Sequence, residues 1–179
     1  MSDAADNARV FIALWPDGGV RAALREWRDG CAWPTSASPV CAEQLHLTLH
    51  FLGNFPRGRL HELVPRLGVR FKPFELALGR PELWHGGIAV LAPDKVPQPL
   101  LALHGVLDEA LARVGVPIEA RPYRPHVTLA RRAGPALAPI QGPPIRWLID
   151  GYALMESKAG AGAGYDIVQW YAAAGRGMR

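Results

Sequence analysis

Two short motifs carry the side chains in this sequence with the clearest capacity for chemistry. They are H-L-T-L, beginning at His46, and H-V-T-L, beginning at His126, so each has a threonine two residues after its histidine. In an extended strand, residues two apart point to the same face. Each motif would therefore present one imidazole and one hydroxyl from one sheet surface.

Two such pairs facing each other suit the opening of a phosphodiester. In-line attack needs a base for the incoming water and an acid for the departing oxygen, on opposite sides of phosphorus. Imidazole can fill either role near neutral pH, and hydroxyl groups can stabilise the charge that builds on the non-bridging oxygens. We predict that His46 and His126 are the catalytic acid–base pair and that Thr48 and Thr128 bind phosphate, with no metal or cofactor required.

The elements that would hold these motifs occur twice. Each half of the chain has an apolar strand, a helix, a proline-containing loop and a strand with H-x-T-L. The first set is Arg9–Trp15, Asp17–Asp29 and Leu45–Leu52; the second is Gly87–Ala92, Pro97–Val114 and His126–Ala130. Equivalent positions lie at similar spacings, 36 residues from Val10 to His46 and 38 from Ile88 to His126. The pattern predicts an internal repeat.

The remaining elements complete one domain. We expect a helix over Gly58–Leu67, weakened by Pro65, a strand from Phe74 to Leu78, and strands at Ile145–Glu156 and Tyr165–Ala172. No stretch has the composition of a linker. The prediction is an α+β fold in which residues 1–179 form a single bilobal domain, with pseudo-repeat halves at roughly 9–79 and 87–172. Two antiparallel sheets would flank a central cleft, with helices outside.

Composition and charge favour an anionic partner. The net charge is +4, and residues 120–149 contain no Asp or Glu but five arginines, at positions 121, 124, 131, 132 and 146. No apolar run reaches the ~20 residues of a membrane span, and the polar start, Met1–Asn7, is unlike a signal peptide. We expect no membrane partner, a cytoplasmic location and a monomer.

Other kinds of site fit the sequence less well. His46 and His50 have helical ligand spacing, but on a strand they would lie about 13 Å apart. No G-x-S-x-G elbow supports a serine nucleophile. Strand alternation predicts that His50 shares the face of His46, while Phe51 points into the core with Leu49. We interpret His50, His61, His85 and His104 as surface or structural residues.

The motifs resemble those of a known family. HLTLHFLG from His46, RPYRPHVTLAR from Arg121, the opening strand RVFIALWP and the closing segments Tyr152–Ser157 and Tyr165–Trp170 are similar to the two-histidine phosphoesterases. Among these, the RNA 2′,3′-cyclic phosphodiesterases, also called 2′-5′ RNA ligase-like proteins, are the most similar. The resemblance implies metal-independent hydrolysis of an RNA 2′,3′-cyclic phosphate end to a 2′-phosphate, with weak reversible 2′-5′ RNA ligation in some members.

The resemblance also extends the set of site residues. It implies that Arg131 helps to bind substrate, although strand alternation puts Arg131 on the face opposite His126, so it reaches the site only if the strand ends or bends. Phe51 either stacks on a base, as in relatives, or lies in the core. Which histidine is the acid stays open.

Two alternatives remain for the function. The same residues could open another substrate, such as a cyclic phosphate of ADP-ribose or 2′-5′ oligoadenylate. The chain could also be an RNA- or nucleotide-binding module without turnover.

Overall fold

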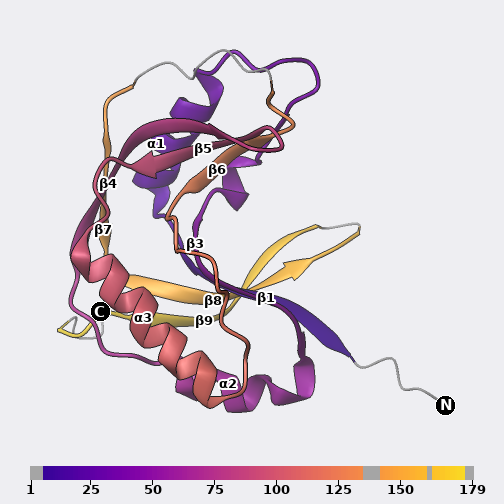
Figure 1. The fold of residues 1–179 in the computed structure, drawn as a ribbon, viewed down its shortest axis with the longest axis vertical. Helices are drawn as coiled ribbons and strands as arrows, with labels where there is room; N and C mark the ends of the chain where they lie inside the picture. Colours follow the sequence, from indigo (N-terminus) through magenta and orange to yellow (C-terminus); the bar gives the residue numbers. More distant parts are fainter. Residues whose placement is uncertain (1–5, 135–141, 161–162, 176–179) are drawn as a thin grey trace.

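Strands with buried residues on one face build a single antiparallel sheet. The structure, a computed structural model, describes residues 6–134, 142–160 and 163–175. The strand order is β7-β4-β5-β6-β3-β1-β8-β9, and the short β2 pairs with β6 (Figure 1). The strands are β1 Asn7–Leu14, β2 Ser38–Pro39, β3 Leu47–Pro56, β4 Phe74–Trp84, β5 Ile88–Pro93, β6 Val127–Arg131, β7 Ile145–Ile149, β8 Gly151–Lys158 and β9 Gly164–Ala172.

Within the described residues, three α-helices pack against this sheet. Helix α1 spans Gly18–Asp29; its N-cap Asp17 accepts a hydrogen bond from the Val20 amide at 2.8 Å. Helix α2 spans Leu60–Arg66 and contains Pro65; helix α3 spans Gln98–Arg113 and follows Pro97. Two short 3-10 helices, η1 Ala42–Gln44 and η2 Arg57–Arg59, precede β3 and α2. In the described part of the chain, no helix is long and apolar enough to cross a membrane.

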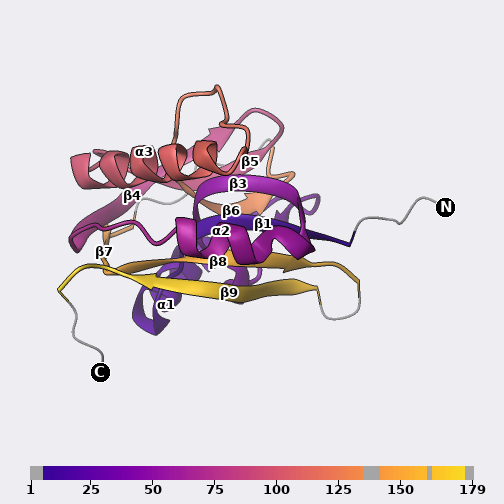
Figure 2. The same cartoon turned by 90° about the horizontal axis from the view of Figure 1, so that it is seen from below.

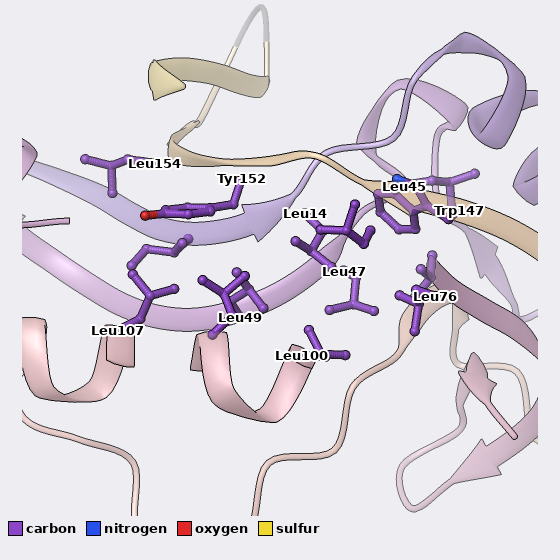
Figure 3. Close-up of a cluster of buried hydrophobic side chains, with 14 of the residues drawn as sticks. Leu14, Leu45, Leu47, Leu49, Leu76, Leu100, Leu107, Trp147, Tyr152 and Leu154 are labelled. Carbon is purple, nitrogen blue, oxygen red and sulfur yellow. The ribbon is translucent and has the colours of Figure 1, made fainter. Parts of the chain in front are cut away.

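The two long helices pack on the same, core-facing side of the curved sheet, because Trp27 of α1 and Leu100 of α3 belong to one buried cluster with Trp147. Helix α1, which follows β1, contacts β6 and β7. Helix α3, which follows β5, lies over β3 and β8, where Leu100 and Leu107 face Leu49 and Tyr152 (Figure 3). In Figure 2, α3 is at the top of the view and α1 at the bottom, at two places along this curved sheet. Helix α1 therefore packs against β6 and β7, and helix α3 against β3 and β8, and neither pair includes the strand that precedes the helix in the sequence.

The sheet divides into two groups of strands joined by a narrow seam. One group is β3-β1-β8-β9 and the other is β7-β4-β5-β6, and β3 meets β6 through one residue pair, Leu47 opposite Val127. The predicted antiparallel α+β fold is therefore present, but the strands form one continuous sheet instead of two separate ones. The seam lies directly after His46 and His126 in the two motifs.

One predicted strand is in fact two. The sequence analysis expects a strand at Ile145–Glu156, but β7 ends at Ile149 beside β4, and β8 begins at Gly151 between β1 and β9. A Cβ at Gly151 would lie 2.1 Å from the Trp170 ring, so a larger residue there would have to displace this ring. Buried and exposed positions alternate along β7, whereas Gly151–Met155 of β8 are all buried, so the pattern changes at the break.

Candidate active site

The five residues predicted to act on phosphate gather around one pocket. This pocket, of about 300 Å³, is called here the histidine pocket. It is lined by Arg9, Phe11, Val40, Gln44, His46, Thr48, Phe51, His126, Thr128, Arg131, Ser157 and Tyr165. These residues come from the strands on both sides of the seam. The pairing of Leu47 with Val127 explains the convergence, because it brings the starts of β3 and β6 together.

Both histidines are held in the same way. The Nδ1 atom of His46 lies 2.6 Å from the carbonyl oxygen of Gln44, and that of His126 lies 2.7 Å from the carbonyl oxygen of Arg124. Because a carbonyl oxygen only accepts hydrogen bonds, Nδ1 is the donor in each ring. Nε2 is therefore the atom left for proton transfer, and that of His46 lies 3.1 Å from the Thr48 hydroxyl oxygen.

His46 sits among aromatic rings. Its ring centroid lies 5.0 Å from that of Phe11, 5.2 Å from Tyr165 and 5.8 Å from Trp15. Burial, with smaller contributions from the nearby His126, Arg21 and Arg131, lowers the pKa of His46 to about 4, against the opposing effect of the Gln44 hydrogen bond. The free protein therefore holds this imidazole neutral at pH 7.

His126 has a different neighbourhood. Its ring lies 4.3 Å from Trp84, and the Arg124 guanidinium lies 4.1 Å from the same indole while pairing with Glu82 at 3.0 Å. Burial is again the main cause that lowers the pKa of His126, followed by the charges of Arg124 and Arg131, while the Arg124 carbonyl and Glu82 oppose them. Both imidazoles are thus poised to accept protons.

A β-bulge in each motif decides which later side chains reach the pocket. Opposite β1, Thr48 pairs with Ala13 and His50 with Ile12, so Leu49 is an extra residue. A bulge of one residue shifts the alternation by one position. Two predictions are therefore wrong: His50 lies on the core side with Ile12, and Phe51, which is 54% exposed, lies on the pocket side.

The second motif has its bulge at the same place. Opposite β5, Thr128 pairs with Val90 and Ala130 with Ala89, so Leu129 is the extra residue. The shift brings Arg131 to the face of His126, and Arg131 lines the histidine pocket. Simple alternation would have placed Arg131 on the face opposite His126 unless the strand ended or bent. The bulge at Leu129 is this irregularity.

The arginines of the acid-free stretch do not act together. Arg121 pairs with Glu119, Arg124 with Glu82 and Arg146 with Glu75, so acidic residues outside the stretch balance three of them. Arg132 donates to the Ser38 hydroxyl. Of the five, Arg131 is the one among the lining residues of the histidine pocket.

Two further residues of the pocket escaped the sequence analysis. Arg9 lies on the face of β1 that carries Phe11, and its guanidinium lies 5.1 Å from the centre of the Phe51 ring. Tyr165 comes from β9, at the other end of the chain, and stands edge-on to His46. Alternation along β1 could have suggested Arg9, but no local signal connects Tyr165 with the first motif.

A second cavity of about 470 Å³ adjoins the histidine pocket and shares Thr48, Phe51 and His126 with it. We call it the side pocket. Its wall includes Trp84 at the end of β4, Arg121, Tyr123 and Arg124 from the segment before β6, and His50, His104 and Asp108 from β3 and α3. Together, the two cavities offer room for more than a phosphate group.

Comparison with known proteins agrees with this geometry. The family model of the 2′-5′ RNA ligase superfamily matches residues 16–161. The chain is 32% identical to the RNA 2′,3′-cyclic phosphodiesterase of Escherichia coli K12 over 141 residues, covering 78% of this chain and 80% of that protein. It is also 32% identical to the protein of that name from Thermus thermophilus over 167 residues, covering 84% and 82%.

A solved structure extends the likeness to the fold. Escherichia coli LigT, crystallised with 3′-AMP, superposes with a TM-score of 0.82 at 27% identity, covering 94% of this chain and 99% of that one. The chain belongs to the 2′-5′ RNA ligase superfamily.

Proposed function

We propose that this chain hydrolyses 2′,3′-cyclic phosphate ends of RNA to 2′-phosphates, with His46 and His126 as the general acid–base pair. Cyclic phosphodiesterase activity is supported by the relatives, which are named for it. The observation that carries the proposal is the shared pocket, in which two equally anchored histidines lie with Thr48, Thr128 and Arg131.

The reaction uses these groups as follows. The Nε2 atom of one histidine removes a proton from water as the water oxygen attacks phosphorus. The P–O3′ bond breaks, and the Nε2–H of the other histidine gives its proton to O3′, leaving a 2′-phosphate. Thr48, Thr128 and Arg131 stabilise the non-bridging oxygens. The same displacement, with an RNA 5′-hydroxyl in place of water as the nucleophile, would join RNA through a 2′-5′ linkage.

The protonation state needed for this reaction depends on the substrate. One histidine must be protonated and one neutral, yet both have lowered pKa values in the free protein. The anionic phosphate favours the charged form of an imidazole beside it. Substrate binding thus supplies the charge that loads the acid.

The side pocket is suited to the nucleotides next to the cyclic phosphate. Phe51, Trp84 and Tyr123 provide aromatic faces on which bases can stack. The complex of LigT with 3′-AMP supports a nucleotide ligand for this fold. All of these groups come from one chain, so we propose that the protein acts as a monomer.

We also propose that the site arose from a duplicated unit within the single domain 1–179, with halves at roughly 9–79 and 87–172. The support is the equivalence of the two motifs in detail: the same histidine anchor, the same bulge after the threonine, and the seam between Leu47 and Val127.

The deciding experiment measures hydrolysis of 2′,3′-cyclic AMP and of an RNA oligomer ending in a 2′,3′-cyclic phosphate, in EDTA, with the 2′- and 3′-phosphate products resolved. We expect the 2′-phosphate from both substrates and a preference for the oligomer. Loss of activity in EDTA that added metal restores would overturn the metal-independent mechanism. If neither substrate is opened, three hypotheses remain to be tested. They are hydrolysis of a cyclic phosphate of ADP-ribose, hydrolysis of 2′-5′ oligoadenylate, and RNA or nucleotide binding without turnover.

A further inference from the structure

A second cluster of reactive side chains lies behind the histidine pocket, between β3 and α3. His50, His104 and Asp108 place potential ligand atoms within 4.8 Å of one another, and they are the one such group found in residues 6–134, 142–160 and 163–175. The bulge at Leu49 creates the cluster, because it turns His50 toward α3. His104 and Asp108 lie one helical turn apart on that helix.

The orientation of His50 leaves an unusual contact. Its Nε2 atom lies 3.1 Å from the carbonyl oxygen of His104, so Nε2 must carry the proton of the neutral ring. Nδ1 then has a lone pair, and it lies 3.5 Å from Oδ1 of Asp108. A carboxylate oxygen is also an acceptor. Two lone pairs therefore face each other unless a cation or a proton lies between them.

Asp108 also lacks a hydrogen-bond partner at one of its carboxylate oxygens, and this observation is independent of the His50 contact. Its Oδ1 atom is buried and has no hydrogen-bond partner among the described residues. A buried carboxylate oxygen without a partner is costly. The second oxygen, Oδ2, lies 3.4 Å from Nδ1 of His104. Both carboxylate oxygens are thus directed at imidazole nitrogens without forming a hydrogen bond to either.

Aromatic stacking encloses both rings. His104 stacks on Tyr123 with centroids 3.9 Å apart and on His50 with centroids 4.1 Å apart. The side chains of His50 and His104 are only 9% and 19% exposed, and burial of this kind disfavours an imidazolium. Neutral imidazole is the form that binds metal ions.

We propose that His50, His104 and Asp108 form a binding site for a divalent transition metal of the zinc class. Two imidazole nitrogens and one carboxylate oxygen are a ligand set typical of Zn²⁺ sites with one open position, whereas Mg²⁺ and Ca²⁺ prefer oxygen ligands. The bond from His50 Nε2–H to the His104 carbonyl is the outer contact that commonly orients a metal-binding histidine. The open position faces the side pocket, which all three residues line.

This site goes beyond the proposed reaction and takes no part in its proton transfers. A bound metal would tie α3 to β3 and leave a water ligand in the wall of the side pocket. His50 and Thr48 are two positions apart on β3, roughly 7 Å along a strand. The metal would therefore sit beside the phosphate-binding groups without replacing them.

The test measures metal binding directly. Protein freed of metal with EDTA and then dialysed is titrated with Co²⁺ at pH 7, following the visible absorption of tetrahedral cobalt, and with Zn²⁺ by equilibrium dialysis and metal analysis. We expect one equivalent per chain. We expect Asp108→Asn, His50→Ala and His104→Ala to weaken binding by at least about 100-fold, since even outer contacts of metal sites contribute 10–100-fold.

Matched controls separate this site from other histidines. His61→Ala and His85→Ala each remove an exposed imidazole and should keep the cobalt spectrum. Circular dichroism checks that each variant is folded; Asp108→Asn, which is nearly isosteric, decides the case if a histidine variant is not. No binding by the wild type would overturn the proposal and indicate a proton between His50 and Asp108. Loss of the spectrum in His46→Ala or His126→Ala, with Asp108→Asn unaffected, would overturn it in favour of the histidine pocket.

Discussion

At the scale of single residues, the two histidines differ more in their surroundings than in their anchors. Each donates Nδ1–H to the carbonyl of the residue two positions earlier, so the same tautomer is fixed twice. His46 is enclosed by Phe11, Trp15 and Tyr165, whereas His126 has Trp84 on one side and Arg124 nearby. The two histidines are thus anchored in the same way, but the surroundings that set their pKa values differ.

Replacement of either histidine tests the proposed pair. We expect His46→Ala and His126→Ala each to lower kcat on 2′,3′-cyclic AMP by roughly 10²–10⁴-fold, because each removes one proton-transfer group. KM should change little, since Thr48, Thr128 and Arg131 remain. Steady-state kinetics with His61→Ala as the control measures both. Full activity in either variant would exclude that histidine from the reaction.

The pH profile tests the lowered pKa values. The active form has one imidazole protonated, so kcat/KM should be bell-shaped between the two pKa values of the free enzyme. With the pKa of His46 at about 4 and that of His126 below its usual 6.5, the maximum should lie on the acid side of pH 6.5. The kcat profile should lie at higher pH, because bound phosphate raises these pKa values. A kcat/KM that still rises above about pH 8 would contradict the pairing.

At the scale of elements, the sequence predicts the strands better than the faces of their side chains. The helix expected at Asp17–Asp29 is present as α1, and the strands expected at the two motifs are present as β3 and β6. The reversal of His50 and Phe51 depends on a bulge at Leu49, which is fixed by pairing with β1 and leaves no trace in the local pattern. Sequence alternation alone therefore could not place residues beyond the bulge.

The turn between β4 and β5 supports the end of β6 and can be tested with a matched pair of glycines. Gly86 and Gly87 have φ values of +76° and +73°. A Cβ at Gly87 would lie 3.0 Å from the Gly134 nitrogen and 3.1 Å from that of Ala133, whereas one at Gly86 would meet nothing within 4 Å.

Alanine at each position should therefore have different effects. Both variants carry the cost of a positive φ, about 1–2 kcal/mol. Gly87→Ala should lose at least about 1 kcal/mol more in the free energy of unfolding, because backbone must move. It should also raise KM, since the displaced segment follows Arg131. Urea denaturation and steady-state kinetics measure these effects. Equal stability of the two variants would show that the close approach of Gly87 to the backbone of Ala133 and Gly134 does not contribute to stability.

At the scale of the whole molecule, the site depends on contacts between distant parts of the chain. Strands β8 and β9 come from the end of the chain; β8 pairs with β1 and β9 with β8, and Tyr165 of β9 contacts His46. Helix α1 packs against β6 and β7, and helix α3 against β3 and β8, instead of against the strands that precede them in the sequence (Figure 1). These pairings determine the wall of the pocket, and they follow from burial over the whole fold, not from any segment. The motifs could therefore predict the reacting groups but not their enclosure.

The same enclosure makes stability depend on pH. Burial is the main cause that lowers the pKa values of His46 and His104 to about 4, and it also lowers those of His50 and His126. In the unfolded chain these groups titrate near 6.5. Above that pH both states are neutral and stability is complete; as pH falls from 6.5 toward 4, the unfolded state binds more protons and stability is lost.

We therefore expect the free energy of unfolding of the metal-free protein to fall steadily between pH 6.5 and 4 and to depend less on these histidines below pH 4. The share of His46 is about 3 kcal/mol at most, from a pKa shift of 6.5 to about 4. His46→Gln removes that titration, so its stability should fall less steeply over the same range, with the exposed His61→Gln as the control for losing an imidazole. Urea denaturation at a series of pH values measures both slopes. If the stability of His46→Gln fell with pH as steeply as that of the wild type, the aromatic enclosure would not hold His46 neutral. The predicted maximum of kcat/KM on the acid side of pH 6.5 would then lose its explanation as well.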